Sequence, residues 1–284
     1  MSEQGALDLA AWTGRTQTLR ETLAPVPAHA LAATLGRATA FDLGSTLPPL
    51  WHWLYFLPLT PAGEIGHDGH ARRGGFLPPV PLPRRMWAGG RFEFRLPLAI
   101  GDEVVKVSTI EKVEPKAGRS GALVFVTVRH ELARAGAAAP ALVEWHDIVY
   151  REAARPGDAA APPQPAPPHA PWQRIWHPDE VLLFRYSALT FNGHRIHYDR
   201  RYVTEVEGYP GLVVHGPLIA TLLLELLHEQ QPDARLARFE FKALRPCFDN
   251  RPLLACGQPD GERVALWARD ADGALAMQAK AELA

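Results

Sequence analysis

The chain has 284 residues, of which 47% are hydrophobic, and carries a formal net charge of −1. This length and composition allow two ordinary domains or one large one, and they exclude a chain that is disordered throughout. The near-zero charge, without a basic block, gives no electrostatic reason to bind nucleic acid or an anionic membrane.

The first predicted element is an apolar helix over Leu47 to Leu57, which starts beside a proline. A long insertion with six prolines, Pro58 to Arg85, follows it. Because proline- and glycine-rich loops of this length in compact domains commonly cover a site, we expect it to frame a substrate tunnel. The alternative is a solvated loop or an interface element. Its basic residues are Arg72, Arg73, Arg84 and Arg85.

Alternation of apolar and charged residues predicts strands after this insertion. The first carries the phrase RFEFR, at Arg91 to Arg95. Three more strands are predicted at Glu103 to Glu114, Ala122 to Leu132 and Leu142 to Arg151.

A proline- and alanine-rich segment then interrupts the pattern, with seven residues of each type between Ala153 and Pro171. It lacks the apolar side chains that pack a core and favours an extended, semi-rigid structure. We therefore predict a linker at 153–171, between an N-terminal domain at 1–152 and a C-terminal domain at 172–284.

The second half repeats the order of a helix followed by strands, which indicates a duplication. A helix predicted at Gly216 to His228 precedes the phrase RFEFK, at Arg238 to Lys242. Its part from Leu218 to Leu227 is apolar on nearly every side, so an antiparallel sheet should enclose it. Further strands are predicted at Arg251 to Cys256, Arg263 to Arg269 and Ala274 to Ala279.

The chemically richest segment runs from Phe184 to Leu227. One short loop offers an amide, two imidazoles, a phenol and a carboxylate. After it, His215-Gly216-Pro217 opens the helix, where free N–H groups and the positive end of the dipole can face a carbonyl or an anion. The loop residues are Asn192, His194, His197, Tyr198 and Asp199.

These residues resemble the hydratase motif of the MaoC-like enoyl-CoA hydratases, in which an Asp and a His lie five positions apart, as Asn192 and His197 do. The phrases FNGHRIHYD and GYPGLVVHGPL are more similar to the type 2 hydroxyacyl-thioester dehydratases, and to bacterial mesaconyl-CoA and itaconyl-CoA hydratases. The segments LPPLWHWLYF, DGHARRGGFLPP and RMWAGGRFEF extend the likeness to the first half. The resemblance implies an α+β double hotdog, with two antiparallel sheets each wrapped around a central helix.

The resemblance also implies an acid–base site. His197 would activate the water, because an imidazole exchanges protons near neutrality, and the Gly216 N–H would hold the thioester oxygen. His215 either points into the site or caps the helix.

Asn192 departs from the family's usual aspartate, because an amide cannot exchange a proton at neutral pH. It either orients a water or is a turn residue that bonds its own backbone. Either His197 alone shuttles the proton through one water, or His194 or Asp199 supplies the missing proton-transfer group. Asp199 could equally cap the next helix or form a surface ion pair.

The implied substrate is a short, branched dicarboxylic acyl-CoA of four to five carbons, with straight-chain 3-hydroxyacyl thioesters as the alternative. A second carboxylate would need a cation, for which Arg73, Arg84, Arg85 and Arg195 are candidates. Trp87 and the other tryptophans of the first half would form a tunnel wall or ordinary core.

The sequence holds no Walker loop, dinucleotide fingerprint, HExxH motif or paired CxxC, so we expect no metal or redox cofactor, with coenzyme A as part of the substrate. The two cysteines, Cys247 and Cys256, favour a reducing compartment, and no apolar stretch reaches the roughly 18 residues of a spanning helix. We expect a cytoplasmic protein in which one chain forms a pseudo-dimer. Its first half should be catalytically silent, and the sequence leaves open whether two chains form a homodimer. A hotdog thioesterase and a non-catalytic acyl-CoA-binding module are the competing functions.

Overall fold

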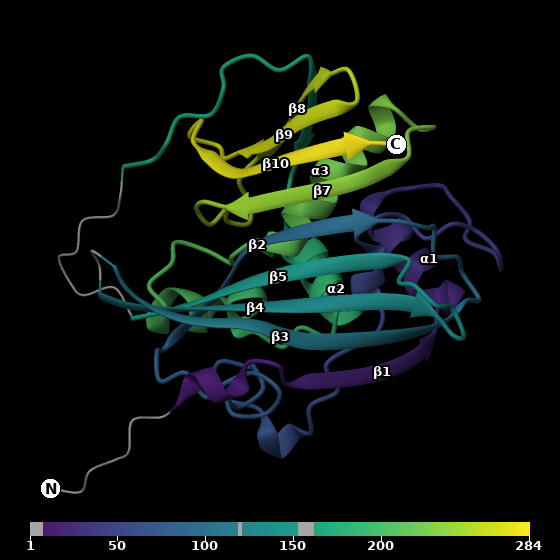
Figure 1. Cartoon of the computed structure of the whole chain (residues 1–284). Coiled ribbons are helices and arrows are strands. Elements are labelled where there is room, and N and C mark those ends of the chain that lie inside the picture. Colours follow the sequence, from purple (N-terminus) through teal and green to yellow (C-terminus); the bar gives the residue numbers. More distant parts are fainter. Residues whose placement is uncertain (1–7, 119–120, 153–161) are drawn as a thin grey trace, which may run out of the picture.

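A computed structural model describes residues 8–118, 121–152 and 162–284. Ten strands of these residues form one antiparallel sheet in the order β1-β3-β4-β5-β2-β7-β10-β9-β8-β6 (Figure 1). The strands of the first half are β1 (Thr16–Thr22), β2 (Arg84–Phe94), β3 (Glu103–Gly118), β4 (Gly121–Arg134) and β5 (Leu142–Arg151). Those of the second half are β6 (Trp172–Trp176), β7 (Leu236–Ala243), β8 (Leu253–Asp260), β9 (Arg263–Arg269) and β10 (Leu275–Leu283).

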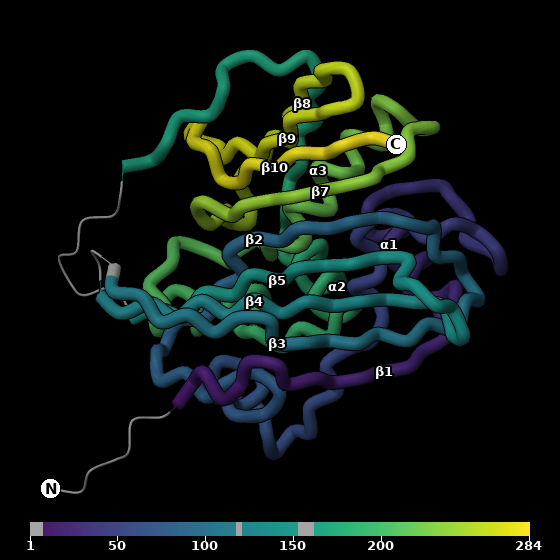
Figure 2. The backbone as a smooth tube through the Cα atoms, in the orientation of Figure 1, coloured from purple at the N-terminus to yellow at the C-terminus, as the bar shows by residue number. Residues whose placement is uncertain are grey.

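The sheet is a duplicated unit, because the order β1-β3-β4-β5-β2 is matched in reverse by β7-β10-β9-β8-β6. The first strand of each half, β1 or β6, lies at an outer edge, and the strand carrying the RFEF phrase, β2 or β7, lies at the centre (Figure 2). The predicted α+β double hotdog is confirmed, and with it the pseudo-dimer within one chain. The predicted strands are all present, while β1 and β6 were not predicted.

The two copies of the repeated phrase pair with each other at the centre of the sheet. Phe92 lies opposite Phe239, and Arg91 and Glu93 lie opposite Glu240 and Arg238. The two phenylalanine rings, both buried, have centroids 6.0 Å apart. The duplicated halves are therefore joined through matching residues.

The helix α3 (Gly216–Gln230) lies behind the second half of the sheet in Figures 1 and 2. Every residue from Leu218 to Leu227 is buried, as the sequence predicts for an enclosed helix. Two further helices, α1 (Pro25–Leu35) and α2 (Glu180–Leu189), contact each other and were not predicted.

The predicted helix over Leu47 to Leu57 is wrong. The segment contains only a 3-10 turn, η2 (Trp51–Leu54). Leu50 and Phe56 have φ angles of 68° and 56°, which no right-handed helix contains. Trp51, Tyr55 and Phe56 are nevertheless buried and Trp53 is half-buried, so the hydrophobic pattern arose from burial without a helix. The other short helices are η1 (Leu9–Trp12), η3 (Ala62–Glu64), η4 (Arg195–His197) and the π-helix η5 (Tyr202–Val206).

The described part of the linker, residues 162–171, runs along the turn between β9 and β10. Leu275 N–H donates to the carbonyl of Gln164, and Ala166 N–H to that of Gly273.

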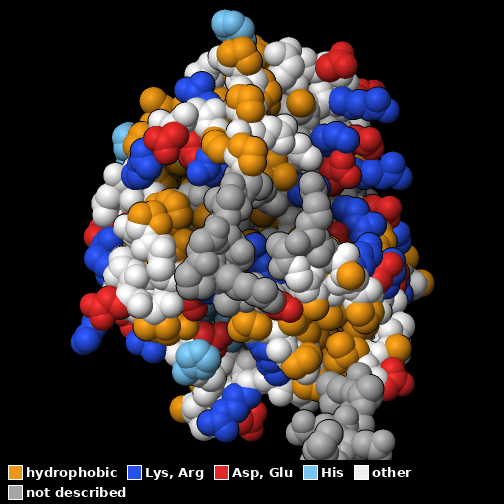
Figure 3. Space-filling view, turned by 90° about the vertical axis from the view of Figure 1, so that its left-hand side faces the viewer, with side chains coloured by type: hydrophobic (Ala, Val, Ile, Leu, Met, Phe, Trp, Pro, Cys, Tyr) orange, Lys and Arg blue, Asp and Glu red, His pale blue; other side chains and the backbone are white. Residues whose placement is uncertain are grey.

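On the face shown in Figure 3, Lys and Arg side chains are mixed with acidic ones. Within the described ranges, no helix is long and apolar enough to cross a membrane.

Candidate active site

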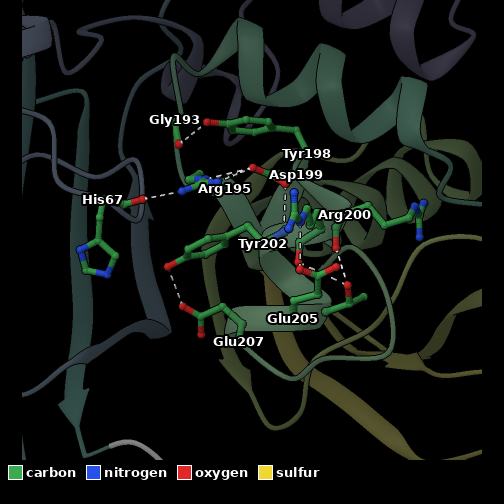
Figure 4. Close-up of polar contacts among 11 residues, drawn as sticks. His67, Gly193, Arg195, Tyr198, Asp199, Arg200, Tyr202, Glu205 and Glu207 are labelled. Atoms are coloured by element: carbon green, nitrogen blue, oxygen red, sulfur yellow. Dashed lines mark hydrogen bonds and ion pairs between the residues drawn. The ribbon is translucent and has the colours of Figure 1, made fainter.

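The loop after α2 is held by its own polar side chains. Asn192 Oδ1 accepts from the His194 N–H at 3.0 Å, and the Tyr198 hydroxyl donates to the Gly193 carbonyl at 2.9 Å (Figure 4). This hydrogen bond to the backbone supports the interpretation of Asn192 as a turn residue. Its amide NH₂ has no acceptor among the described residues, which leaves this group available to a water.

Asp199 stabilises the chain after this loop. Its Oδ1 accepts from the Tyr202 N–H at 2.9 Å at the start of η5, and its Oδ2 accepts from the Arg195 guanidinium at 2.7 Å. Both structural alternatives for Asp199, the cap and the ion pair, are present together (Figure 4). Both oxygens of its carboxylate are therefore engaged by structural partners.

His197 is 7% exposed and has a fixed tautomer. Its Nδ1 lies 2.7 Å from the carbonyl oxygen of Val213, which can only accept, so Nδ1 carries the proton and Nε2 is a free base. Burial lowers the pKa of His197 to about 4, although the hydrogen bond to Val213 opposes the shift. The ring is thus neutral at pH 7 and able to accept a proton from water.

His215 stacks on one face of the His197 ring. The two imidazoles stack with centroids 3.7 Å apart at 18°, and His215 Nε2 shares a hydrogen bond of 2.8 Å with the buried Ser187 hydroxyl. Its side chain makes no cap hydrogen bond to α3, which excludes the capping alternative in this structure. Burial holds the pKa of His215 well below its ordinary value, so the stacked pair does not carry two charges.

Gly216 begins α3 with an open backbone. A Cβ built on it would meet no atom within 4 Å, and its N–H has no acceptor among the residues that the structure describes. The first N–H groups of a helix lack intrahelical partners. This position therefore combines a free donor with room for a carbonyl oxygen to approach.

The insertion between Leu57 and β2 docks onto this loop from the first half. The Arg195 N–H donates to the Asp68 carbonyl at 2.9 Å, and its guanidinium to the His67 carbonyl at 3.0 Å (Figure 4). A Cβ on Gly69 would overlap the Gly193 carbonyl, so two glycines permit this approach. The insertion therefore covers the loop, and its role in framing a substrate tunnel stays a prediction.

This docking places three further groups together: Asp68, His70 and His194. His70 Nδ1 lies 3.1 Å from Asp68 Oδ2, and its ring centroid is 3.9 Å from that of His194. Their ligand-type atoms all lie within 4.8 Å of one another, so within the described chain this set has the spacing to hold a divalent metal. Sequence reasoning missed Asp68 and His70, although both lie in the quoted phrase DGHARRGG.

The candidate arginines differ in their partners. Arg73 donates to the carbonyls of Val80 and Pro83, Arg84 pairs with Glu207, and Arg195 pairs with Asp199. Arg85 makes no ion pair with a described acidic residue. It lies opposite Tyr150 on the neighbouring strand, and its charge helps to lower the pKa values of His70, His146 and His194, which burial lowers most. Among the four arginines, Arg85 is therefore the one without an acidic partner in the described part of the chain, and its charge acts on the histidines.

Trp87 lies two residues after Arg85 on β2 and packs against other aromatic rings. Its ring stacks on His146 at 3.8 Å and lies edge-on to Trp53 at 5.0 Å, while its Nε1–H donates to the Gly89 carbonyl at 2.8 Å. The indole N–H is thus occupied. Trp87 can contact a ligand only through its ring.

Asn192 offers a direct test of its two interpretations. We expect Asn192→Asp to retain measurable activity and to add an acidic limb to the pH profile, because a carboxylate can exchange a proton where the amide cannot. We expect Asn192→Ala to lower kcat roughly tenfold or more. Steady-state kinetics from pH 5 to 9 measure both. Equal activity in all three forms would leave Asn192 as a turn residue alone.

The buried histidines predict a loss of stability in acid. The pKa of His197 is about 4 in the fold because of burial, against about 6.5 in an unfolded chain. Below pH 6.5 the unfolded chain therefore binds the extra proton, and stability falls until pH 4, by about 3 kcal/mol for this residue. Urea unfolding at pH 7 and pH 4.5 measures the difference. His197→Gln should have a smaller pH dependence than the parent.

Comparisons with known proteins agree with this geometry. The family described as hydroxyacyl-thioester dehydratase type 2 matches residues 50–249. Mesaconyl-C(4)-CoA hydratase of Chloroflexus aurantiacus is 46% identical over 97% of this chain and 98% of its own. The mitochondrial hydroxyacyl-thioester dehydratase type 2 of Schizosaccharomyces pombe is 30% identical over 88% of this chain and 91% of its own. The crystal structure of HtdX from Mycobacterium tuberculosis superposes with a TM-score of 0.68 at 18% identity, covering 95% of this chain and 100% of that one.

Proposed function

Because the chain belongs to the hydroxyacyl-thioester dehydratase type 2 family, we propose that it is a hydro-lyase that adds water reversibly to a short, branched dicarboxylic enoyl-CoA. The substrate by this proposal is mesaconyl-CoA or itaconyl-CoA, and the product is a citramalyl-CoA. The substrate class is supported by the relative named mesaconyl-C(4)-CoA hydratase. The proposal includes a cytoplasmic location and a reaction without a metal or redox cofactor.

One observation carries the chemistry: a neutral, buried imidazole with a free Nε2 lies in the loop that precedes the open start of α3. His197 accepts a proton from water as the water oxygen bonds to the β-carbon. The Gly216 N–H donates to the thioester oxygen, where the negative charge develops. A single preorganised donor of this kind typically stabilises a transition state by about 3 kcal/mol.

Arg85 supports the choice of a dicarboxylic substrate. A guanidinium without an acidic partner among the described residues, whose charge acts on His70 and His194, can bind the second carboxylate through paired hydrogen bonds. The partly buried tryptophans Trp53 and Trp87 lie edge-on to each other, and Trp87 is two residues from Arg85 on β2.

The test uses purified protein with mesaconyl-C4-CoA, crotonyl-CoA, octenoyl-CoA and acetyl-CoA. Hydration removes the ultraviolet absorbance of the conjugated thioester and releases no thiol. We expect the largest kcat/KM with mesaconyl-C4-CoA. Faster hydration of octenoyl-CoA would favour the fatty acyl alternative, release of thiol would indicate a thioesterase, and binding without either change would indicate a binding module.

A further inference from the structure

The proposed reaction needs two proton transfers, and the loop of the second half provides one clear group for them. Water must lose a proton, which His197 accepts, and the α-carbon must gain one. Asn192 cannot deliver that proton, and Asp199 is engaged by Arg195 and by the start of η5. Either His197 alone shuttles the proton through one water, or a second acid–base group from elsewhere in the chain takes part.

The insertion of the first half brings such a group to the loop. Asp68 holds His70 at two points: Oδ1 accepts from the His70 N–H and Oδ2 from its Nδ1–H, both at 3.1 Å. The doubly held imidazole has its Nε2 left for proton transfer. Its ring lies against His194, which in turn lies edge-on to His197 with centroids 5.5 Å apart.

We propose that His70 is a catalytic residue that exchanges the proton at the α-carbon of the substrate, and that Asp68 is the residue that positions its ring. The inference rests on the proposed hydration reaction. It departs from the expectation that the first half is catalytically silent, since both groups come from that half.

The proton transfers balance with water as the co-reactant. In hydration, His197 Nε2 takes a proton from water while the water oxygen bonds to the β-carbon. The π electrons of the double bond move towards the thioester, and the protonated His70 gives its Nε2 proton to the α-carbon. The proton on His197 then returns to His70 through solvent or His194. Dehydration reverses each step.

The groups around His70 make its protonated ring a stronger acid, and they also reduce the protonated fraction near neutral pH. Burial, with Arg85 and Arg73 nearby, lowers the pKa of His70, whereas the hydrogen bond to Asp68 opposes this shift. Burial by itself would raise the pKa of Asp68, but the bond from His70 brings it below its ordinary value, so the carboxylate is ionised. His194 has its pKa lowered by burial to about 2 and stays neutral between the two proton-transferring rings.

A matched pair of variants tests the proposal. His70→Gln removes the imidazole, and His67→Gln removes an exposed one from the same insertion, whose carbonyl alone contacts the site loop. With mesaconyl-C4-CoA, we expect kcat to fall at least ~100-fold in His70→Gln, with KM within about threefold of the parent. We expect His67→Gln to keep the parent kcat.

Two readouts separate chemistry from structure. In the dehydration of an α-deuterated hydroxyacyl-CoA, His70→Gln should show a larger primary isotope effect than the parent, because transfer of that proton becomes slower. Added imidazole should restore part of the activity of His70→Ala. Asp68→Asn should lower kcat about tenfold and shift the limb of the pH profile that His70→Gln lacks altogether.

The outcomes that overturn the proposal are distinct. If the parent hydrates the substrate and His70→Gln matches His67→Gln, His70 has no catalytic role. If the parent contains one equivalent of metal by mass spectrometry, and His70→Gln lacks both that metal and activity, the cluster is a metal site. A parent without hydratase activity would refute the proposed function itself, before any variant is compared.

Discussion

Replacement of His197 by glutamine is expected to lower kcat by at least ~100-fold, since a positioned general base contributes about 10² to 10⁴ to the rate. Glutamine keeps a polar side chain of similar reach but cannot accept the proton of the attacking water. The loss should appear equally in kcat and kcat/KM, because the imidazole acts in the transition state. Stopped-flow loss of enoyl absorbance with mesaconyl-C4-CoA measures it.

The matched control is His177→Gln, which changes an exposed histidine of the same half. Circular dichroism and thermal melting of both variants establish that the fold is kept. Activity of His197→Gln within threefold of the parent would remove His197 from the mechanism.

Replacement of Arg85 by glutamine is expected to lower kcat/KM for mesaconyl-C4-CoA by about 100-fold, while the value for crotonyl-CoA changes less than about threefold. Removal of one partner of a buried, hydrogen-bonded charge pair costs about 2 to 5 kcal/mol, and about 1.4 kcal/mol corresponds to a tenfold change. Crotonyl-CoA has no second carboxylate and should not sense the loss. The ratio of the two specificity constants is the measurement.

The control for this prediction is Arg91→Gln, on the same strand. Its guanidinium makes a half-exposed ion pair with Asp147 at 3.6 Å, and such surface pairs contribute little. Equal loss on both substrates in Arg85→Gln would assign Arg85 to the fold or to the histidines, not to the dicarboxylate.

Regular periodicity made most of the sheet and α3 predictable. The strand β7 alternates exposed and buried residues from Arg238 to Lys242, and α3 is apolar on nearly every side, so sequence alone predicts how each is buried. The helix expected at Leu47 to Leu57 failed because burial of tryptophans produces the same composition with or without a helix. The edge strand β1 reads TQTLRET and carries too few apolar residues to be noticed.

Some residues of the candidate site could be predicted from the sequence and others could not. Asn192, His194 and His197 lie in six consecutive residues, so the sequence alone predicts that they are close together. Asp68 and His70 reach them across more than 120 residues, through a backbone contact between Gly69 and Gly193. Such a contact depends on how two distant loops dock, and no local pattern of residues encodes it.

The pairing of Phe92 with Phe239 at the centre of the sheet has a consequence for how this molecule can change. In a dimer of two identical chains, every substitution appears twice and both copies must tolerate it. Fusion into one chain removes that requirement, but β2 and β7 must still match each other: Phe92 faces its own counterpart Phe239, and Arg91 faces Glu240. The pairing of β2 with β7 can thus stay fixed while the two halves specialise. The second half keeps the central helix α3, and the first half has the 3-10 turn η2 and a long insertion in its place.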